Sequence, residues 1–453
     1  MCRKIKYFMY ILFICGGVAF TNNVNSKETN KIKDYFDYVN YDWWYSFNDS
    51  NLQKYILKGL LNNNDLKILN LKVKEYGDFV KYTFGEELPT ITTSLQYSNV
   101  KDIPFNNSTI NSDGLMLPLN VSYELDLFGK KRLKTKSVEK QLEIYNYQLQ
   151  GAYISFVSNL STLYFNIVRY NEIISLYDEL ILIKNKILKD EIITYNNGLN
   201  RKVNINQTKQ DIRKIKTERI NILKNRDALL TQFAVMLGET PAKAKEIKIT
   251  DFNKINFTGK ISAPISSNII FVRPDVLITE KQLEKAKIDI KVARREFLPT
   301  FNISGSLIFN DMASGGFFSS ANTIKSLMAG VSQPLFLGGK LRFNLKMKQT
   351  QYEGLLEEYK KTSLQAVKEV NDSLVNMIYG ESISVLNHKN LILEVNNYND
   401  YKIQYKNGLI SYTDLLKTKQ NLIISKINVV NSKIENYIDY ISLYKATAGK
   451  INN

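Results

Sequence analysis

The sequence predicts an α+β protein built from two copies of one unit, in which two strands precede a very long helical hairpin. Three observations predict this fold class: landmarks that recur after 210 residues, strands with a period of two, and helices with apolar residues at heptad spacing. The landmarks are Leu88-Pro89-Thr90 and Leu298-Pro299-Thr300, Gly129-Lys130 with Arg132 and Gly339-Lys340 with Arg342, and Tyr195-Asn196-Asn197-Gly198-Leu199 and Tyr405-Lys406-Asn407-Gly408-Leu409. Because self-similarity at a fixed period is the signature of repeat architectures, we interpret the chain as a tandem duplication. We place the copies at residues 20–260 and 261–453.

The first residues are typical of a secretory signal peptide. Residues 3–6 carry three basic side chains, and the apolar stretch 7–19 is shorter than the roughly 20 residues of a membrane-spanning helix. Gly17 and Ala19 place small residues where a signal peptidase cleaves, so we predict a signal peptide at 1–19.

Both cysteines of the chain, Cys2 and Cys15, precede this predicted cleavage site. The mature protein would then contain no thiol and no disulfide. As an alternative, Cys15 could become a lipidated N-terminus after a different cut, although Ile14 stands where a lipoprotein signal prefers a small residue.

The net charge of +17 comes from Lys and Arg residues that are spread among Asp and Glu along helical segments. No compact basic run dominates, so we interpret the charge as solvated helix faces and expect no nucleic-acid partner. His388 is the only histidine, and no Gly-rich phosphate loop occurs. Because a metal site needs several suitable ligands, we expect neither an enzyme nor a cofactor or metal.

The first copy begins with residues 20–40, which are polar and predict an extended tail. Trp43-Trp44 follows and is interpreted as a packing anchor at a helix entry. Asn48, Asp49 and Ser50 are N-cap candidates for the helical pattern that starts at Leu52 and ends before Pro89.

Apolar and polar residues then alternate over about 90–99 and 115–127, with a polar loop expected at 100–114. The second copy repeats the two strands at about 300–310 and 324–336. Two-faced strands of this length fit a half-buried soluble sheet or a transmembrane barrel. Four strands cannot close a barrel, since the smallest barrels have about eight, so a barrel would have to be shared between subunits.

Helical hairpins are predicted at about 129–238 and 339–447, each with a Gly-containing turn at its tip. In the first, apolar residues recur every seven positions, as in a coiled coil. A helix from about 130 to 195 would be roughly 100 Å long. A soluble coiled-coil scaffold also fits this pattern.

The chain from Asp42 to Gly449 resembles the TolC-like outer-membrane efflux proteins, in particular the NodT-type branch that serves tripartite pumps. The stretches that carry the resemblance are Trp43-Trp44 with Phe47, Asn63-Asn64-Asp65-Leu66, Tyr123 with Asp126-Leu127-Phe128-Gly129, Arg273-Pro274-Asp275-Val276, Phe297-Leu298-Pro299, and Gln333-Pro334-Leu335-Phe336 with Gly338-Gly339. The resemblance implies a homotrimer in outer-membrane lipid, with four strands per protomer in one twelve-stranded barrel and the hairpins in a periplasmic α-helical tunnel.

The resemblance also implies a gate at the hairpin tips. Tyr405 matches a gate tyrosine of the family, and Asp414 a constricting aspartate that would form a three-fold carboxylate ring. Asn204 stands where the tyrosine's aspartate partner is expected, and Lys417 replaces a second aspartate. The residues implied to contact a periplasmic adaptor are Asn197, Gly198, Leu199, Asn407, Gly408, Leu409 and Ser411.

Two departures at the predicted gate leave its chemistry open. Ile410 and Val203 replace an arginine–threonine contact of the family. Asp414 also fits a second role, as a carboxylate at the positive end of a helix beside Ser411 and Thr413.

The predicted function is therefore an exit duct for small toxic compounds, opened by a periplasmic adaptor and an inner-membrane pump. The duct of a one-step (type I) protein secretion system is the first alternative. A periplasmic coiled-coil scaffold without a channel is the second, and it leaves the alternation at 115–127 unexplained.

Overall fold

The computed structural model describes residues 42–105, 108–259, 267–310, 317–318 and 320–449, which belong to one unit of the chain. The predicted signal peptide at 1–19, the lipidation alternative at Cys15 and the tail at 20–40 lie outside the described residues.

The tandem repeat is confirmed by three pairs of helices that have equal lengths and lie 210 residues apart. The pairs are α5 (Asn64–Gly85) and α8 (Pro274–Arg295), α6 (Lys130–Asn196) and α9 (Lys340–Lys406), and α7 (Lys202–Met236) and α10 (Tyr412–Ala446). The left-handed residues Gly129 and Gly339 precede the two longest helices, with φ of 72° and 81°. The hairpins therefore begin and end at equivalent positions.

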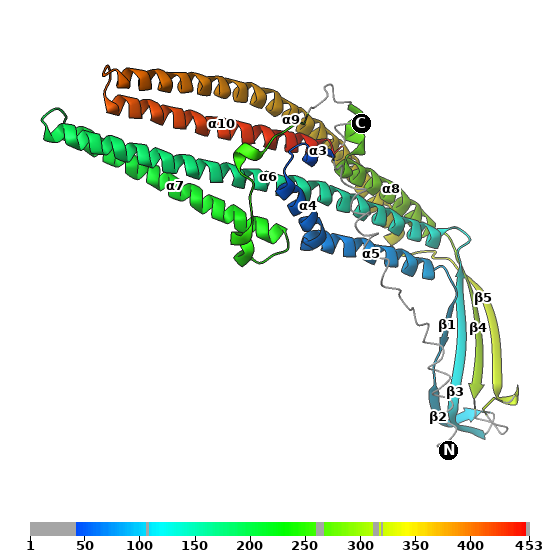
Figure 1. Cartoon of the computed structure of the whole chain (residues 1–453). Coiled ribbons are helices and arrows are strands. Elements are labelled where there is room, and N and C mark those ends of the chain that lie inside the picture. Colours follow the sequence, from blue (N-terminus) through cyan, green and yellow to red (C-terminus); the bar gives the residue numbers. More distant parts are fainter. Residues whose placement is uncertain (1–41, 106–107, 260–266, 311–316, 319, 450–453) are drawn as a thin grey trace. The chain divides into compact units, whose positions relative to one another are not determined.

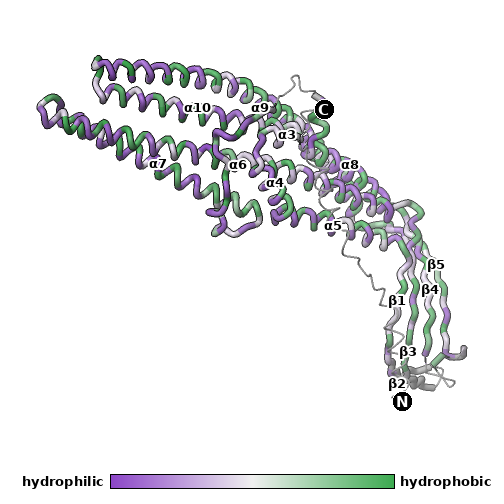
Figure 2. Tube along the Cα trace, in the orientation of Figure 1, coloured by the Kyte–Doolittle hydropathy of each residue, from purple (hydrophilic) through white to green (hydrophobic). Residues whose placement is uncertain are grey.

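The long helices pack side by side in the order α7, α6, α10, α9, so α6 and α10 are flanked on both sides (Figure 1). Closer to the sheet the order is α5, α6, α8, α9. In α6 a buried apolar stripe runs from Ile144 to Ile187, whereas α9 buries only Ala366 and Ser373. Figure 2 shows hydrophobic and hydrophilic residues interleaved along all four helices. The helices α7 and α9 are thus the edges of the layer.

The Trp pair is a buried anchor, as predicted. Trp43 and Trp44 of α3 (Asp42–Tyr45) are 2% and 1% exposed. Trp43 stacks on Tyr444 with ring centroids 4.3 Å apart, and Phe47 lies 4.6 Å from Phe165. The start of the described chain therefore packs against α6 and α10.

Asp49 is the N-cap of α4 (Ser50–Asn62) and joins three parts of the first copy. Its Oδ1 accepts from the backbone N of Leu52 at 3.2 Å and from Thr250 Oγ1 at 2.8 Å. Tyr164 donates to its Oδ2 at 2.7 Å. Thr250 lies between the short 3₁₀ helices Pro241–Glu246 and Phe252–Lys254. The hydrogen bonds of Asp49 therefore join the segment that connects the two copies to α4 and α6.

Two helix junctions occupy equivalent positions in the copies. At the first, Asn63 Nδ2 donates to the carbonyl of Met236, the last residue of α7, at 3.0 Å. At the second, Arg273 Nη1 donates to the carbonyl of Ala446, the last residue of α10, at 2.8 Å. The second helix of each hairpin, α7 or α10, therefore ends against the residue that precedes α5 or α8. One side chain at each junction satisfies an otherwise unpaired carbonyl.

The sheet is antiparallel, and β3 (Ser108–Leu125), β4 (Thr300–Asn310) and β5 (Thr323–Ser332) are neighbours in that order. Both β1 (Thr90–Thr93) and β2 (Gln96–Phe105) pair with the remaining edge of β3, at different heights. They share one strand position, which gives four positions in the chain. One edge of β5 and the outer edge of β1 and β2 have no strand beside them among the described residues.

The predicted polar loop at 100–114 is wrong. β2 continues to Phe105 and β3 begins at Ser108, with Phe105 opposite Ser108 in the register. Polar composition indicated a loop there, but strand pairing satisfies the backbone groups whatever the side chains are. At the other end, the strand predicted at 324–336 stops at Ser332. Pro334 cannot donate to a strand ladder, which accounts for the early end.

No helix in the described part of the chain is both long enough and apolar enough to cross a membrane.

A candidate gate at the hairpin tips

The two tip turns have the same backbone geometry. In the first, Gly198 has φ 77° and its N–H donates to Tyr195, while Leu199 N donates to Thr194 O at 2.8 Å. In the second, Gly408 has φ 73°, and Leu409 N donates to Gln404 O at 2.9 Å. Paired bonds of this kind close a helix end with a left-handed residue.

The residues predicted to contact an adaptor lie at these two turns or directly after the second. They are Asn197, Gly198, Leu199, Asn407, Gly408, Leu409 and Ser411. Leu199 and Leu409 are 81% and 72% exposed. Each tip turn therefore presents an exposed leucine to its surroundings.

Ser411 is the N-cap of α10, and its hydroxyl also binds the Asp414 carboxylate. Ser411 Oγ accepts from Asp414 N at 3.1 Å and donates to Asp414 Oδ2 at 2.7 Å. Lys417 Nζ lies 3.9 Å from Asp414 Oδ1. This is the geometry of the helix-end alternative for Asp414, and it also leaves the carboxylate half exposed.

Tyr405 and Asn204 share no hydrogen bond in the protomer. The ring of Tyr405 lies 5.4 Å from that of Tyr412, and Asn204 Nδ2 donates to Asn200 Oδ1 at 2.6 Å. Both residues are exposed, one on each hairpin. Their predicted contact stays a prediction.

The structure adds Asp190 to the tip residues, which the sequence did not single out. Thr413 Oγ1 donates to Asp190 Oδ2, which joins the start of α10 to the end of α6. No linear pattern pairs residue 190 with residue 413, because the contact depends on how the two hairpins pack. Two ion pairs cross the same seam, Lys419 Nζ to Glu179 Oε1 at 3.0 Å and Arg169 Nη1 to Glu435 Oε2 at 3.1 Å.

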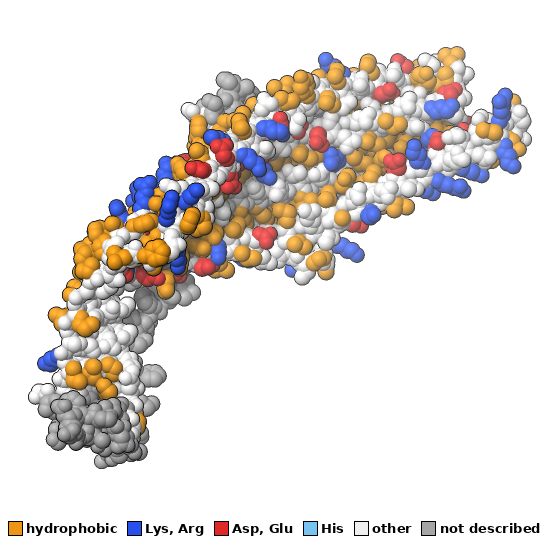
Figure 3. Space-filling view, turned by 180° about the vertical axis from the view of Figure 1, so that it is seen from behind, with side chains coloured by type: hydrophobic (Ala, Val, Ile, Leu, Met, Phe, Trp, Pro, Cys, Tyr) orange, Lys and Arg blue, Asp and Glu red, His pale blue; other side chains and the backbone are white. Residues whose placement is uncertain are grey.

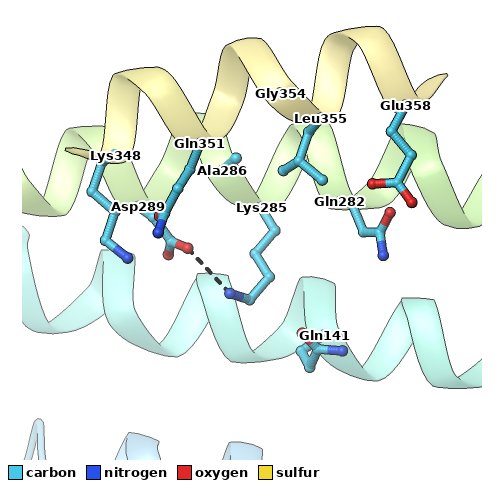
Figure 4. A pocket seen from close by; sticks show the side chains of 10 residues that line it. All are labelled: Gln141, Gln282, Lys285, Ala286, Asp289, Lys348, Gln351, Gly354, Leu355 and Glu358. Atoms are coloured by element: carbon cyan, nitrogen blue, oxygen red, sulfur yellow. Dashed lines mark hydrogen bonds and ion pairs between the residues drawn. The ribbon is translucent and has the colours of Figure 1, made fainter. Parts of the chain in front are cut away.

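A hollow of about 450 Å³ lies over α8, between α6 and α9 (Figure 4). Lys285 Nζ is 3.1 Å from Asp289 Oδ2, whose other oxygen accepts from Ser137 Oγ at 2.5 Å. The remaining lining is mixed, with Gln141, Gln282, Lys348, Gln351, Leu355 and Glu358 among its residues. It lies on helices close to the sheet and includes none of the predicted gate residues.

Large apolar side chains are exposed along α9, and Figure 3 shows such side chains running over the helices with Lys and Arg near the hairpin tips. More than half of each of the following α9 side chains is exposed: Leu364, Ile378, Tyr379, Leu386, Leu393 and Ile403. Monomeric proteins seldom expose long apolar stripes, so this edge is suited to a protein contact.

A sheet with two open edges, continued by two helical hairpins, defines a protomer that contributes strands and helices to a channel. A model of the outer membrane efflux protein family matches residues 56–239 and 266–449, two segments that are themselves 210 residues apart. The chain belongs to the outer membrane efflux protein family.

The solvent efflux pump outer membrane protein SrpC of Pseudomonas putida is 25% identical over 427 residues, covering 89% of this chain and 86% of that protein. The cation efflux system protein CusC of Escherichia coli K12 is 23% identical, covering 91% of this chain and 90% of that protein. The crystal structure of the outer membrane channel CmeC of Campylobacter jejuni superposes with a TM-score of 0.82 at 22% identity, covering 91% of this chain and 88% of that one.

The protein is thus an outer-membrane efflux channel, with its helical tunnel in the periplasm. The predicted fold class is confirmed. The family and these relatives are transport proteins.

Proposed function

We propose that three copies of this chain form a passive exit duct, which receives small toxic compounds from an inner-membrane pump through a periplasmic adaptor. The observation that carries this proposal is the matching pair of open edges. The sheet ends at β5 on one side and at β1 and β2 on the other, and the helical layer ends at α9 and α7. Unpaired strand edges are removed when a sheet closes into a barrel.

Joining β5 of one protomer to β1 and β2 of the next gives twelve strand positions in three copies. The same rotation brings α9 of one protomer to α7 of the next, and the exposed apolar stripe of α9 supports that contact. Because the contact joins two different surfaces, it produces a closed ring when the rotation is one third of a turn.

The tips would form the gate and the adaptor-binding end of the duct. Three copies of Asp414 would line the constriction, each capped by Ser411 and approached by Lys417. The nearby lysine reduces the negative field of the ring, so we propose weak cation selectivity in the closed state. Tyr405 and Asn204, both exposed in the protomer, would be within reach of partners in the assembled tip.

Small compounds are the proposed cargo because the names of the relatives specify solvents for SrpC and cations for CusC. The chain spans most of the length of both proteins, which supports a common transport role.

A deletion strain tested against dyes, detergents, antibiotics and metal ions would test this function. We expect hypersensitivity that the intact gene reverses, with an unchanged profile of secreted proteins. Loss of one secreted protein with unchanged sensitivity would contradict the proposal in favour of protein export. Absence of conductance when the purified protein is added to a lipid bilayer would contradict any channel.

A further inference from the structure

We propose that the hollow over α8, between α6 and α9, is a binding site for organic cations that carry a protonated amine on an apolar body. The site would lie on the inner wall of the duct. The inference therefore rests on the proposed function and names one class of cargo within it. At about 450 Å³, the hollow is within the size range of small-molecule pockets.

The hollow exists in the second copy because large side chains of the first copy are missing there. Between α5 and α6, Tyr76 and Tyr145 lie with ring centroids 4.3 Å apart, and Phe79 lies 5.8 Å from Tyr76. The residues that stand 210 positions later, in α8 and α9, are Ala286, Leu355 and Asp289. All three line the hollow, so two rings have been replaced by smaller apolar groups and the third by a carboxylate.

Gly354 of α9 also lines the hollow, and its counterpart in α6 is Ile144, which is 2% exposed. A Cβ at Gly354 would meet no atom within 4 Å, so no close contact requires a glycine there. Glycine in a helix interior is destabilising relative to alanine. A residue that weakens its helix and leaves space unfilled is suited to keeping a binding site open.

The hollow lies on the side of the helical layer that continues the polar face of the sheet. Ser122 and Glu124 lie on that face of β3, with Asn302 of β4 opposite Glu124. Lys130 Nζ, at the start of α6, is 3.0 Å from Glu124 Oε1. Gln141 of the hollow follows Lys130 by about three helical turns, so both lie on one side of α6. Because the polar face of a transmembrane barrel faces its lumen, the hollow opens toward the interior of the duct.

The other side of α6 is covered by the start of the described chain. Tyr164 donates to Asp49, and Phe165 lies against Phe47. These two residues of α6 follow Gln141 by about six and a half turns, so they point away from its side of the helix. Two separate reference points thus agree on the direction in which the hollow opens.

One end of the hollow contains hydrogen-bond acceptors without donors. Glu358 of α9 makes no hydrogen bond or ion pair with the described residues. The Oε1 atom of Gln282, from α8, is shielded from solvent and has no hydrogen-bond partner in that part of the chain. Figure 4 shows the two side chains next to each other at this end. A protonated amine supplies both the N–H donors and the positive charge that these acceptors lack.

The rest of the hollow accounts for the apolar body of the ligand. Leu355 and Ala286 provide apolar surface beside the acceptors. Lys285 is neutralised by Asp289, whose carboxylate lies 3.1 Å away. Lys348 lies at the Asp289 end, about 15 Å from Glu358 along α9 (Figure 4). We therefore place the amine at Glu358 and Gln282, with its apolar body over Leu355.

Fluorescence anisotropy with dansylated probes tests the site on the purified full-length protein in detergent. Dansylcadaverine carries a primary ammonium on an apolar fluorophore. Its N-acetyl derivative is the neutral control, and dansylglycine is the anionic one. We expect dansylcadaverine to bind more tightly than both, because only its ammonium can donate to Glu358 as a cation.

Glu358→Gln should raise the Kd of dansylcadaverine about tenfold, because it removes the charged acceptor and keeps the shape of the side chain. The matched control is Glu357→Gln. It removes the same charge from the next residue, which does not line the hollow and is paired with Lys360. The control should change the Kd less than about twofold.

Gly354→Leu should abolish binding, because its side chain would occupy the hollow. Leucine favours a helix more than glycine does, so we expect the variant to fold. Gly354→Ala adds a single carbon and should have a much smaller effect on the Kd. The pair separates the loss of space from the loss of a glycine.

Two results would overturn the proposal. One is an unchanged Kd of dansylcadaverine in both Glu358→Gln and Gly354→Leu. The other is tighter binding of dansylglycine than of dansylcadaverine, abolished by Lys348→Gln, which would assign the hollow to anions. Bilayer conductance separates this inference from the proposed function. Wild-type protein that conducts but binds no amine would refute the site alone, whereas wild-type protein without conductance would contradict the duct.

Discussion

The two helix junctions share a geometry but differ in chemistry. Asn63 binds the end of α7 with a neutral amide, whereas Arg273 binds the end of α10 with a guanidinium. The Arg273 side chain is 8% exposed and is also held by Asp275 at 2.7 Å and Glu369 at 2.6 Å. Glu369 belongs to α9, so the second junction joins α8, α9 and α10.

The difference shows that the duplication preserves which backbone carbonyl must be satisfied, and leaves the donor free to change. A neutral donor needs only its acceptor, but a buried cation also needs carboxylates. The second copy therefore contains a three-helix ionic cluster where the first has a hydrogen bond and a cap.

Among variants that alter these junctions, Arg273→Met should have the largest effect on stability. Removing the buried guanidinium breaks its ion pairs with Asp275 and Glu369, which are 45% and 44% exposed, and leaves the Ala446 carbonyl without its side-chain donor. We expect the free energy of unfolding to fall by about 3 kcal/mol, measured by denaturant titration of the helical signal. Arg294→Met, at an exposed position of α8, is the control; an equal loss there would contradict the role of the cluster.

A second difference between the copies lies in the packing of α10. Asp439 is 9% exposed, and the equivalent residue of α7 is Leu229. Burial, assisted by the charge of Glu435, raises the pKa of Asp439 to about 6 from an ordinary 3.8. A carboxyl with a raised pKa in the folded state stabilises the fold below its ordinary pKa, and this contribution is lost as the pH rises through about 6.

Asp439→Asn should therefore raise stability at pH 7.5 by roughly 2 kcal/mol relative to wild type. The gain should disappear near pH 4, where wild-type Asp439 is already protonated in the folded protein. Unfolding curves at the two pH values check this. A stability difference that is the same at both would show that Asp439 does not titrate between them.

At the first junction we expect a smaller loss than at Arg273. Asn63→Ala removes the bond to the Met236 carbonyl and also the N-cap of α5, in which Asn63 Oδ1 accepts from Leu66 N at 3.1 Å. The expected cost is about 1.5 kcal/mol, from the same denaturant titration. Asn63→Asp keeps the cap but loses the donor, so it should lie between Asn63→Ala and wild type; a loss as large as that of Arg273→Met would remove the contrast between the junctions.

The smallest expected effect on stability comes from the residue two positions after the end of α7 and of α10. Gly238 has φ 74°, and Ala448 stands at the equivalent position with φ 52°. A side chain in this left-handed region costs about 1 kcal/mol, so Ala448→Gly should be stabilising by about that amount or less. The reciprocal change Gly238→Ala should be destabilising, since a Cβ would lie 2.7 Å from the Asn62 carbonyl oxygen. Thermal unfolding of both variants checks the signs.

Much of the fold could be predicted from the sequence because its signals are local or periodic. The repeat, the helix limits set by Gly129, Gly198 and their counterparts, and the strand at 300–310 all appear as predicted. The parts of β2 and β3 within 100–114 could not be predicted, since their residues are polar and form strands by pairing with each other. Sequence pattern measures solvation and propensity, and it misses structure that depends on a neighbouring strand.

Only part of the candidate gate could be predicted from the sequence. Resemblance led to Tyr405 and Asp414, and the helix-end position of Asp414 beside Ser411 and Thr413 could be predicted from the sequence. Asp190 and the junction partners Met236 and Ala446 are distant in sequence from the residues they bind. Such contacts are fixed by how helices pack against one another, which no linear spacing records.

The equal lengths of α6 and α9 constrain how the gene can change. Each helix has 67 residues and ends in the same turn. Inserting one residue into a single copy would extend that tip by about 1.5 Å and rotate it by about 100° relative to the other. A partner that binds both tips at one level would then lose contacts at one of them, so we expect an insertion or deletion to be accommodated best when both copies acquire it together.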